Sequence, residues 1–177
     1  RTNLEKLRQT APQWYPLAAY LSGKGFDLYR NTALRYLPTG EAYLEDMLTT
    51  LDTAQRFIFL EYFIMAEGEI WDRLSDILCR KSRQGVEVKL IFDDFGSMMR
   101  MPNEKIDALQ DAGVEVRVFN PVHHYVNRLY FNYRDHRKIT CVDGDIAYTG
   151  GANIADEYAN LIERFGYWKD CGVRLEG

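Results

Sequence analysis

The sequence has few cysteines, few histidines and no long hydrophobic run. Cys79, Cys141 and Cys171 lie far apart and form no CxxC pair. Neither a disulfide framework nor a zinc ribbon is therefore expected, and we interpret the cysteines as buried, reduced thiols of a cytosolic environment. The longest apolar run, FIFLEYFIM at residues 57–65, contains Glu61. It is shorter than the roughly 20 residues that cross a bilayer, so no transmembrane segment is expected within this chain.

The chain also lacks an excess of positive charge. Its 177 residues carry a net charge of -4, and 46% of them are hydrophobic. This composition is typical of one folded domain with a sizeable core. A net negative charge does not attract polyanions, so we expect no nucleic-acid partner and disfavour a nuclease. Because the chain begins without Met and stops on the strand-like GVRLEG, we expect a fragment of a longer protein that is itself soluble.

Strand and helix patterns alternate along most of the chain. Residues 1–25, interrupted at Pro12 and Pro16, predict an N-terminal helical extension, and residues 26–177 predict a single domain. The periodicity predicts strands at 34–37, 56–65, 86–92 and 114–119, and helices at 41–54, from Ile70 to Gly85 and at 103–112. The fold class is therefore α/β, with a mostly parallel or mixed sheet that helices flank on both faces.

The pattern changes after Pro121. Two short strands at 138–142 and 146–149 are joined at Asp143-Gly144, which is a strong hairpin signal. A short helical turn follows Asn153, and residues 168–175 predict a final strand. Ligand-binding residues of open α/β sheets lie at strand ends, so we expect the chemistry there.

His136 and Lys138 are the first candidates for chemistry. In an extended segment, residues i and i+2 project from the same face, so an imidazole and an ammonium would lie side by side. An imidazole can attack phosphorus, and a lysine can neutralise phosphate oxygens, without a metal or another cofactor. The alternative is an ordinary solvated strand. The Asp143 spacing and the following GGxN sequence favour the chemical interpretation.

Three further positions accompany this pair. Asp143 lies at the hairpin turn, where a carboxylate commonly accepts backbone N–H groups, so a scaffolding role is expected. Gly150-Gly151 allows the backbone to approach a ligand closely, and the Asn153 amide can donate to a phosphate oxygen.

The segments that carry these residues resemble a known family. NYRDHRKITCVDGDIAYTGGANIADEY and YWKDCGVRLEG, with the upstream GEAYLEDMLTTLDTAQRFIFLEYFI and GVEVKLIFDDFGS, resemble the phospholipase D superfamily and its HxKxxxxD...GGxN motif. The resemblance is to the first catalytic half of bacterial cardiolipin synthases and covers roughly residues 34–177.

The resemblance implies roles for individual residues. It makes His136 the nucleophile or the general acid, and it makes Lys138 and Asn153, with the backbone at Gly151, ligands of the phosphate. Asp143 is the third member of the motif's catalytic set. Asp170 matches a carboxylate that holds the second ring nitrogen of the histidine. Alternatively, Asp170 pairs on the surface with Lys169 or Arg174.

The implied activity is phosphatidyl transfer in phospholipid biosynthesis. Two phosphatidylglycerols would give cardiolipin and glycerol through a phosphohistidine intermediate. The family uses two motifs, from two halves of one chain or from two subunits, whereas this chain has one. We therefore expect the fragment alone to be inactive. The longer protein would lie at a bacterial cell membrane, with its catalytic domain facing the cytoplasm.

Two other hypotheses remain open. One is a homodimeric phospholipase D-like phosphodiesterase or nuclease, in which two copies of His136 face each other. The other is a half-domain that binds phosphate at His136 and Lys138 without performing chemistry.

Some residues give weaker signals. Glu61 interrupts an apolar strand and either supports the site or pairs with an arginine. Asp93-Asp94 either lines a pocket or forms a turn. We interpret His123-His124 as a solvated loop pair, not a metal site, because neighbouring side chains on an extended chain point in opposite directions.

A cluster of aromatic and basic residues precedes the motif. It could form an interfacial lip for an anionic lipid headgroup, or it could be loop packing. Its members are Tyr125, Arg128, Tyr130, Phe131, Tyr133 and Arg134.

Overall fold

The computed structural model describes residues 2–122 and 132–177. It divides into two compact units, one of residues 1–33 with Gly177 and one of residues 34–176. The first unit contains α1 (Asn3–Thr10), the 3-10 helix η1 (Pro12–Trp14) and α2 (Tyr15–Gly23). The break at Pro12 is as expected, whereas Pro16 lies in the first turn of α2, where proline is tolerated.

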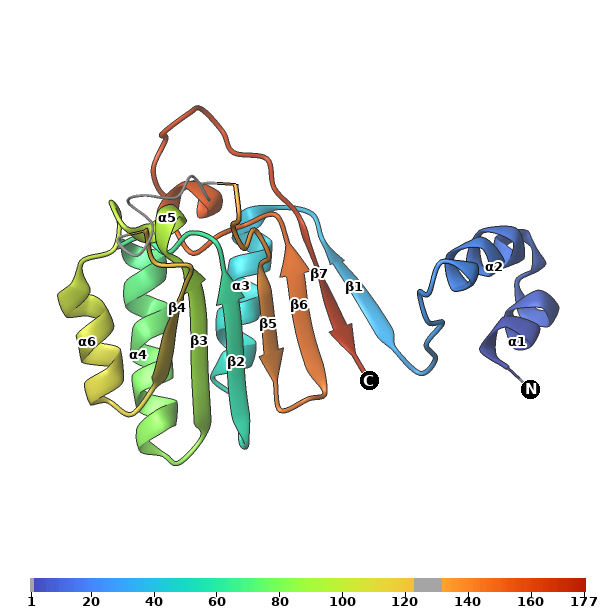
Figure 1. Ribbon diagram of the computed structural model, residues 1–177, viewed down its shortest axis with the longest axis horizontal. Helices are drawn as coiled ribbons and strands as arrows, with labels where there is room; N and C mark the ends of the chain where they lie inside the picture. Colours follow the sequence, from blue (N-terminus) through green and yellow to red (C-terminus); the bar gives the residue numbers. More distant parts are fainter. Residues whose placement is uncertain (1, 123–131) are drawn as a thin grey trace. The chain divides into compact units, whose positions relative to one another are not determined.

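The second unit is built on a seven-stranded mixed sheet (Figure 1). Strands β2, β3 and β4 are parallel. On the other side of β2 the sheet continues with antiparallel pairs, first β2 with β5, then β5 with β6 and then β6 with β7. The order across the sheet is β1 (Ala33–Leu37), β7 (Gly172–Glu176), β6 (Ile146–Gly150), β5 (Ile139–Val142), β2 (Phe57–Tyr62), β3 (Glu87–Asp93) and β4 (Glu115–Phe119). The predicted β5–β6 hairpin is confirmed.

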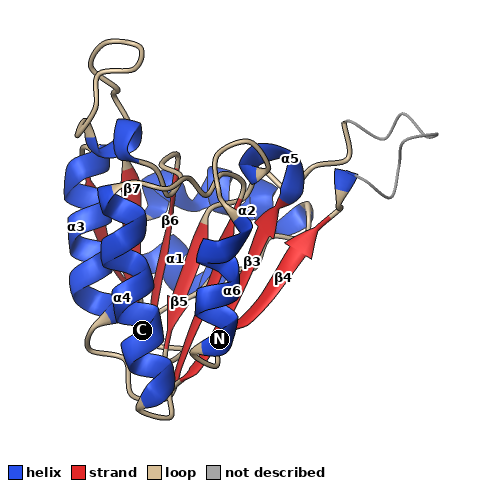
Figure 2. Ribbon diagram, turned by 90° about the vertical axis from the view of Figure 1, so that its left-hand side faces the viewer, coloured by secondary structure: helices blue, strands red, loops and turns tan. Residues whose placement is uncertain are grey.

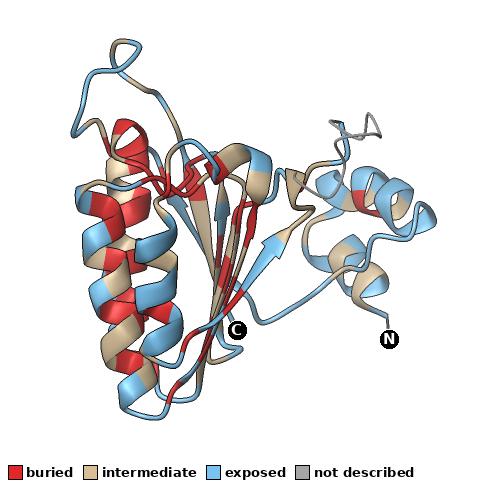
Figure 3. Cartoon of the chain, turned by 60° about the vertical axis from the view of Figure 1, so that its left-hand side comes forward, coloured by how far each residue is buried: buried red, intermediate tan, exposed pale blue. Residues whose placement is uncertain are grey.

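Helices cover one face of this sheet (Figure 2). They are α3 (Gly40–Leu51), α4 (Glu69–Arg83) and α6 (Asn103–Asp111). Buried residues gather between these helices and the strands (Figure 3). In β2, for example, Ile58, Leu60 and Tyr62 point into this core, while the residues between them are only partly buried. The α/β class is thus confirmed.

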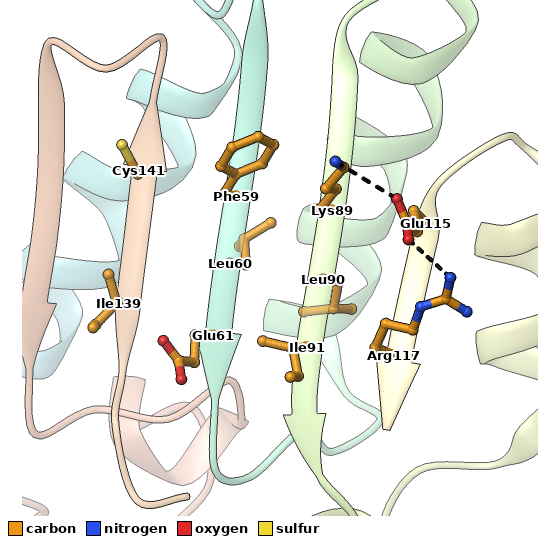
Figure 4. Close-up of a pocket in the computed structure, with 10 residues that line it drawn as sticks. All are labelled: Phe59, Leu60, Glu61, Lys89, Leu90, Ile91, Glu115, Arg117, Ile139 and Cys141. Atoms are coloured by element: carbon orange, nitrogen blue, oxygen red, sulfur yellow. Dashed lines mark ion pairs between the residues drawn. The ribbon is translucent and has the colours of Figure 1, made fainter. Parts of the chain in front are cut away.

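The opposite face differs from the expectation of helices on both sides. Among the described residues of the second unit, no helix covers this face, which carries a pocket of about 300 Å³ (Figure 4). The apolar run of β2 suggested burial on both faces, but Lys89 and Glu115 on the neighbouring strands are exposed and form an ion pair. Charged residues at alternating strand positions indicate a face that is in contact with water.

One edge of the sheet collects the segments that matter for the site. The ends of β2, β3 and β6 meet there with the starts of β5 and β7, because Glu61 pairs with Ile139, and Gly150 pairs with Gly172. The short helix α5 (Asp94–Ser97) and the 3-10 helix η3 (Asp156–Ala159) lie in the connections at this edge. In the described part of the chain, no helix is both long and apolar enough to cross a membrane.

Candidate active site

His136 and Lys138 lie side by side just before β5, as the sequence predicts. The Lys138 Nζ is 3.1 Å from the His136 Nδ1 and donates a hydrogen bond of 2.7 Å to the His136 carbonyl oxygen. The imidazole is exposed, whereas the lysine side chain is buried. The nucleophile candidate can therefore reach a substrate, and the cation beside it is held in one position.

Phe63, at the end of β2, packs against both residues. Its ring centroid is 4.6 Å from that of His136 and 5.3 Å from the Lys138 Nζ. Sequence reasoning missed this residue, because an aromatic side chain in an apolar run suggests an ordinary core position. The ring removes water from one side of the pair and so increases the desolvation of both groups.

The two groups affect each other electrostatically. Burial and then the Lys138 charge lower the pKa of His136, while Asp135 and Asp93 oppose this shift. Burial lowers the pKa of Lys138 to about 8, and Asp170 and Asp135 oppose that shift. The imidazole is consequently neutral at pH 7, which is the protonation state that a nucleophilic histidine needs.

Asp93 holds the segment that leads to His136. Its carboxylate is fully buried, accepts from the Asp135 backbone N–H at 3.0 Å and lies 3.4 Å from the Arg134 guanidinium. It also caps α5 by accepting from the Gly96 N–H. Its neighbour Asp94 accepts from the Val122 N–H. Asp93 therefore joins the turn at the end of β3 to the extended segment, which explains why an acid is buried there.

Asp143 lies at the other end of β5, away from the imidazole. Its carboxylate accepts from the backbone N–H groups of Gln55, Arg56 and Phe57, at 2.7 to 2.8 Å. Burial alone would raise the pKa of Asp143, but these bonds outweigh burial and lower it. The scaffolding role expected from the sequence agrees with this geometry, although the amides belong to the start of β2 and not to the turn of Asp143 itself.

Asn153 and Gly151 have structural partners. The buried Asn153 side chain accepts from the Ile64 N–H at 2.9 Å and donates to the Tyr158 hydroxyl at 2.8 Å. A Cβ atom on Gly151 would lie only 2.2 Å from an Asp170 carboxylate oxygen. Asn153 thus joins the end of β2 to the segment after β6, and Gly151 leaves room for Asp170. These contacts give both residues a packing role beside the phosphate contact that the resemblance implies.

Asp170 acts electrostatically on Lys138, and its carboxylate lies beside Gly151. Its carboxylate accepts from the Cys171 N–H at 2.8 Å and from the Trp168 Nε1 at 3.3 Å. The alternative partners are engaged elsewhere: Lys169 donates to the Pro38 carbonyl, and Arg174 pairs with Asp46 and Glu176. The group facing the His136 Nδ1 is Lys138, where the resemblance implies Asp170.

Glu61 forms a charged cluster on the opposite side of the same segment. It pairs with Arg137 at 2.6 Å, and Arg137 also pairs with Asp135 at 2.9 Å. Burial and Asp135 raise the pKa of Glu61 to about 7, whereas Arg137 helps to hold the pKa of Asp135 at about 2. Glu61 lines the pocket of the helix-free sheet face (Figure 4). Of the two expectations for Glu61, the arginine pair is therefore present, and it includes the two neighbours of His136.

The remaining candidates fall partly outside the described residues. His123-His124 and most of the aromatic cluster, Tyr125, Arg128, Tyr130 and Phe131, are in this category. Tyr133 is exposed, and Arg134 packs over the Phe95 ring and donates to the Asn120 carbonyl oxygen. Within residues 2–122 and 132–177, no group of three or more His, Cys, Asp or Glu side chains is arranged to hold a metal ion.

Comparisons with known proteins show the family of the chain. Residues 47–163 match the family model described as cardiolipin synthase, PLD-like domain. A cardiolipin synthase of Oceanobacillus iheyensis is 38% identical over 160 residues, which are 90% of this chain and 31% of the relative. The chain spans between 28% and 38% of the length of the curated relatives that it matches.

Solved structures share the fold. The phosphatidylserine synthase of Haemophilus influenzae superposes with a TM-score of 0.64 at 16% identity, over 81% of this chain and 33% of that chain. The phospholipase D family member Nuc of Salmonella typhimurium gives a TM-score of 0.55 at 18% identity, over 82% of each chain. The match over most of the second unit, together with this fold, shows that the chain belongs to the PLD-like domain family of the cardiolipin synthases.

Proposed function

We propose that this chain provides one half of the active site of a phosphatidyltransferase that makes cardiolipin from two phosphatidylglycerols. The observation that carries the proposal is the exposed, neutral imidazole of His136 beside the buried ammonium of Lys138. A neutral imidazole can attack a phosphodiester, and a desolvated cation next to it can stabilise the negative charge that develops on the phosphoryl oxygens.

In the first step, a ring nitrogen of His136 forms a bond to phosphorus, and the bond from phosphorus to the glycerol headgroup oxygen breaks. The departing oxygen takes a proton from a second histidine, and glycerol leaves. In the second step, that histidine removes a proton from a headgroup hydroxyl of another phosphatidylglycerol. The resulting oxygen displaces His136 from phosphorus and forms cardiolipin. One diester bond replaces another, so the reaction needs no external energy source.

Lys138 and Asp170 have successive roles in this scheme. Before substrate binds, the Lys138 Nζ lies at the His136 Nδ1. We propose that a phosphate draws the ammonium toward its oxygens and that Asp170, whose charge already acts on Lys138, then supports the proton on Nδ1. Asn153 and the backbone at Gly151 would hold further phosphate oxygens. Asp143 supports the site indirectly by fixing the far end of β5.

The second histidine must come from outside this chain. None of the described residues near His136 is another histidine, and His123-His124 lack a lysine two positions on. We propose that a second motif, from a longer chain or from a second subunit, completes the site and that the chain alone is inactive. The complete protein would act at the bacterial cell membrane, with this domain on the cytoplasmic side. Its partner would then be a phospholipid, not a nucleic acid.

The test is to supply phosphatidylglycerol labelled in its phosphate to the longer protein that contains this chain. We expect labelled cardiolipin and, after a rapid quench, a phosphatidyl group on His136 that mass spectrometry can locate. His136→Ala should abolish both signals without unfolding the exposed site. Equal cardiolipin formation by the wild type and the variant would refute the proposal. A label on the second histidine alone would assign His136 to the acid role.

A homodimeric phosphodiesterase is the second candidate. The observation in its favour is that the fold matches 82% of the length of Nuc, a family member whose chain is about as short as this one. In that case two copies of His136 would face each other, and water would accept the phosphoryl group. Light scattering that finds only monomer, together with no hydrolysis of a chromogenic phosphodiester, would exclude it.

A further inference from the structure

The connection between η3 and β7 presents an unusual apolar tip. We call residues 161–167 the tip loop. Its sequence LIERFGY contains four large apolar or aromatic side chains, and all of them are exposed by 45% to 70%: Leu161, Ile162, Phe165 and Tyr167. A single exposed apolar side chain is ordinary, but four in seven residues form a local patch, which commonly marks an interaction site.

The tip loop is held out from the domain by its base. The Asn160 side chain accepts from the Trp168 N–H at 2.6 Å and donates to the Trp168 carbonyl oxygen at 3.0 Å. These two hydrogen bonds join the two ends of the loop. The Trp168 ring packs edge-on against Tyr158 at 5.1 Å. The backbone turns at Gly166, whose φ is 81° and where an added Cβ atom would meet open space. The base is therefore ordered, while the apolar tip extends beyond the strand ends (Figure 1).

The tip loop stands at the same edge of the sheet as His136. It returns into β7 at Gly172, which pairs with Gly150 at the end of β6, next to the start of β5. Its base also contacts the site, because the Trp168 Nε1 donates to the Asp170 carboxylate. A surface in contact with the tip loop would thus lie close to the exposed His136 side chain.

A second exposed apolar group lies at this edge. Phe95, Met98 and Met99 follow the end of β3, and Met99 is 87% exposed. Since β3 and β6 lie on opposite sides of β2 and β5 in the sheet, the site lies between this group and the tip loop. Exposed apolar side chains on both sides of the site could contact the same flat apolar surface, such as a lipid bilayer, at once.

We infer that the tip loop is a membrane-docking element that inserts its apolar side chains into the surface of a phospholipid bilayer beside the active site. Aromatic and aliphatic side chains next to a guanidinium are typical of segments that lie at the boundary between headgroups and acyl chains. Arg164 packs over the Phe165 ring at 5.3 Å and also pairs with Glu157.

A protein partner fits the tip loop less well. A stable protein interface uses about 20–30 residues on each side, whereas the patch has seven. The loop's own charges, Glu163 and Arg164, cancel. Docking should therefore depend on apolar area and persist at high salt, which a purely electrostatic contact would not do. The choice of a membrane rests on the proposed lipid substrate, but the docking can be measured without turnover.

The experiment measures binding of this chain to vesicles of phosphatidylglycerol and phosphatidylcholine in 0.5 M salt by co-sedimentation. Ile162→Ser/Phe165→Ser should weaken partitioning by at least about tenfold, because two apolar side chains no longer enter the bilayer. The matched control is Leu34→Ser/Tyr36→Ser, which removes two similarly exposed apolar side chains from β1 and should change partitioning less than twofold.

A second readout reports insertion directly. Phe165→Trp should gain fluorescence that lipids brominated on their acyl chains quench, whereas Tyr36→Trp should not. Equal partitioning of the two double variants, or no quenching at position 165, would overturn the inference. So would a shift from dimer to monomer in the tip-loop variant with vesicle binding unchanged, because the loop would then be a protein contact. If vesicle binding depends on the tip loop but the protein makes no cardiolipin, the proposed reaction is refuted and the docking inference is supported.

Discussion

The two ends of β5 contain members of one motif in opposite physical states. At the far end, the Asp143 carboxylate has a backbone amide for nearly every lone pair, and its pKa is lowered accordingly. At the near end, Lys138 is buried beside an imidazole, and its pKa falls to about 8. The hydrogen-bonded carboxylate of Asp143 stabilises the fold, whereas the desolvated ammonium of Lys138 is costly to the fold but suited to binding an anion. A shared motif therefore does not imply a shared role.

The largest effect on stability is expected at Asp143. Asp143→Ala leaves the Gln55, Arg56 and Phe57 amides without their acceptor, so we expect a loss of about 2–4 kcal/mol in the free energy of unfolding. Urea denaturation measures it. Asp145→Ala is the matched control. The Asp145 side chain is 75% exposed, and its ion pair with Arg56 is long at 3.8 Å. It should change stability by less than about 0.5 kcal/mol. Equal effects of the two variants would contradict the scaffolding role.

Substitution of the desolvated Lys138 should change stability in the opposite direction. In the folded state the pKa of Lys138 is below its unfolded value, so the folded chain binds fewer protons between about pH 8 and pH 10.5. The Lys138 contribution to stability therefore rises with pH across this window, and it is unfavourable at pH 7. Lys138→Met should remove this rise and stabilise the chain at pH 7 by on the order of 2 kcal/mol.

Lys89→Met is the control for this prediction, because Lys89 is exposed and surface ion pairs contribute little. Thermal unfolding at pH 7 and at pH 9.5 measures both variants. A lower unfolding temperature of Lys138→Met at pH 7 would show that the ammonium stabilises the folded state. Lys138 and Asp143 would then both stabilise the fold.

The charged cluster of Glu61, Arg137 and Asp135 should have a smaller effect on how stability depends on pH. The pKa of Glu61 is raised to about 7, so between about pH 4.5 and pH 7 the folded chain binds more protons than the unfolded chain. Stability from this group is present at low pH and lost as pH rises through 7. Below pH 4 the lowered pKa of Asp135 works in the opposite direction, and stability falls as pH approaches 2.

Glu61→Gln, which cannot titrate, should flatten the slope between pH 4.5 and pH 7 and change stability by on the order of 1 kcal/mol. Urea midpoints at half-unit pH intervals measure it. An unchanged slope would mean that Arg137 alone sets the charge of Glu61.

Gly151→Ala should lower stability by about 1 kcal/mol, no more than Glu61→Gln changes it, but it should act on the site. The new Cβ would displace the Asp170 carboxylate, which raises the pKa of Lys138. We therefore expect the pKa of Lys138 to fall further below 8 when it is followed by NMR. Gly23→Ala, where nothing lies within 4 Å, is the control and should leave that pKa unchanged. An unchanged pKa of Lys138 in Gly151→Ala would show that Asp170 does not influence the charge of Lys138.

Local patterns in the sequence predicted much of the fold. Helical spacing predicted α3, α4 and α6 to within a few residues, and Asp143-Gly144 predicted the β5–β6 hairpin. These features depend on neighbours in the chain, which is why periodicity finds them. The helix-free face of the sheet escaped prediction. The apolar run of β2 does not reveal that Lys89 and Glu115 would lie beside it, because strand pairing is a long-range property.

By itself, the sequence determined the α/β class, the motif and the adjacency of His136 and Lys138, because two residues at i and i+2 on an extended chain must share a face. Only the tertiary structure decided which residues surround that pair. Phe63 and Asp93 come from other strands, the Asp143 carboxylate is satisfied by the start of β2, and Asp170 is positioned through Gly151. The physical reason is that desolvation and hydrogen-bond partners depend on distances in space, and these set the charge of each group.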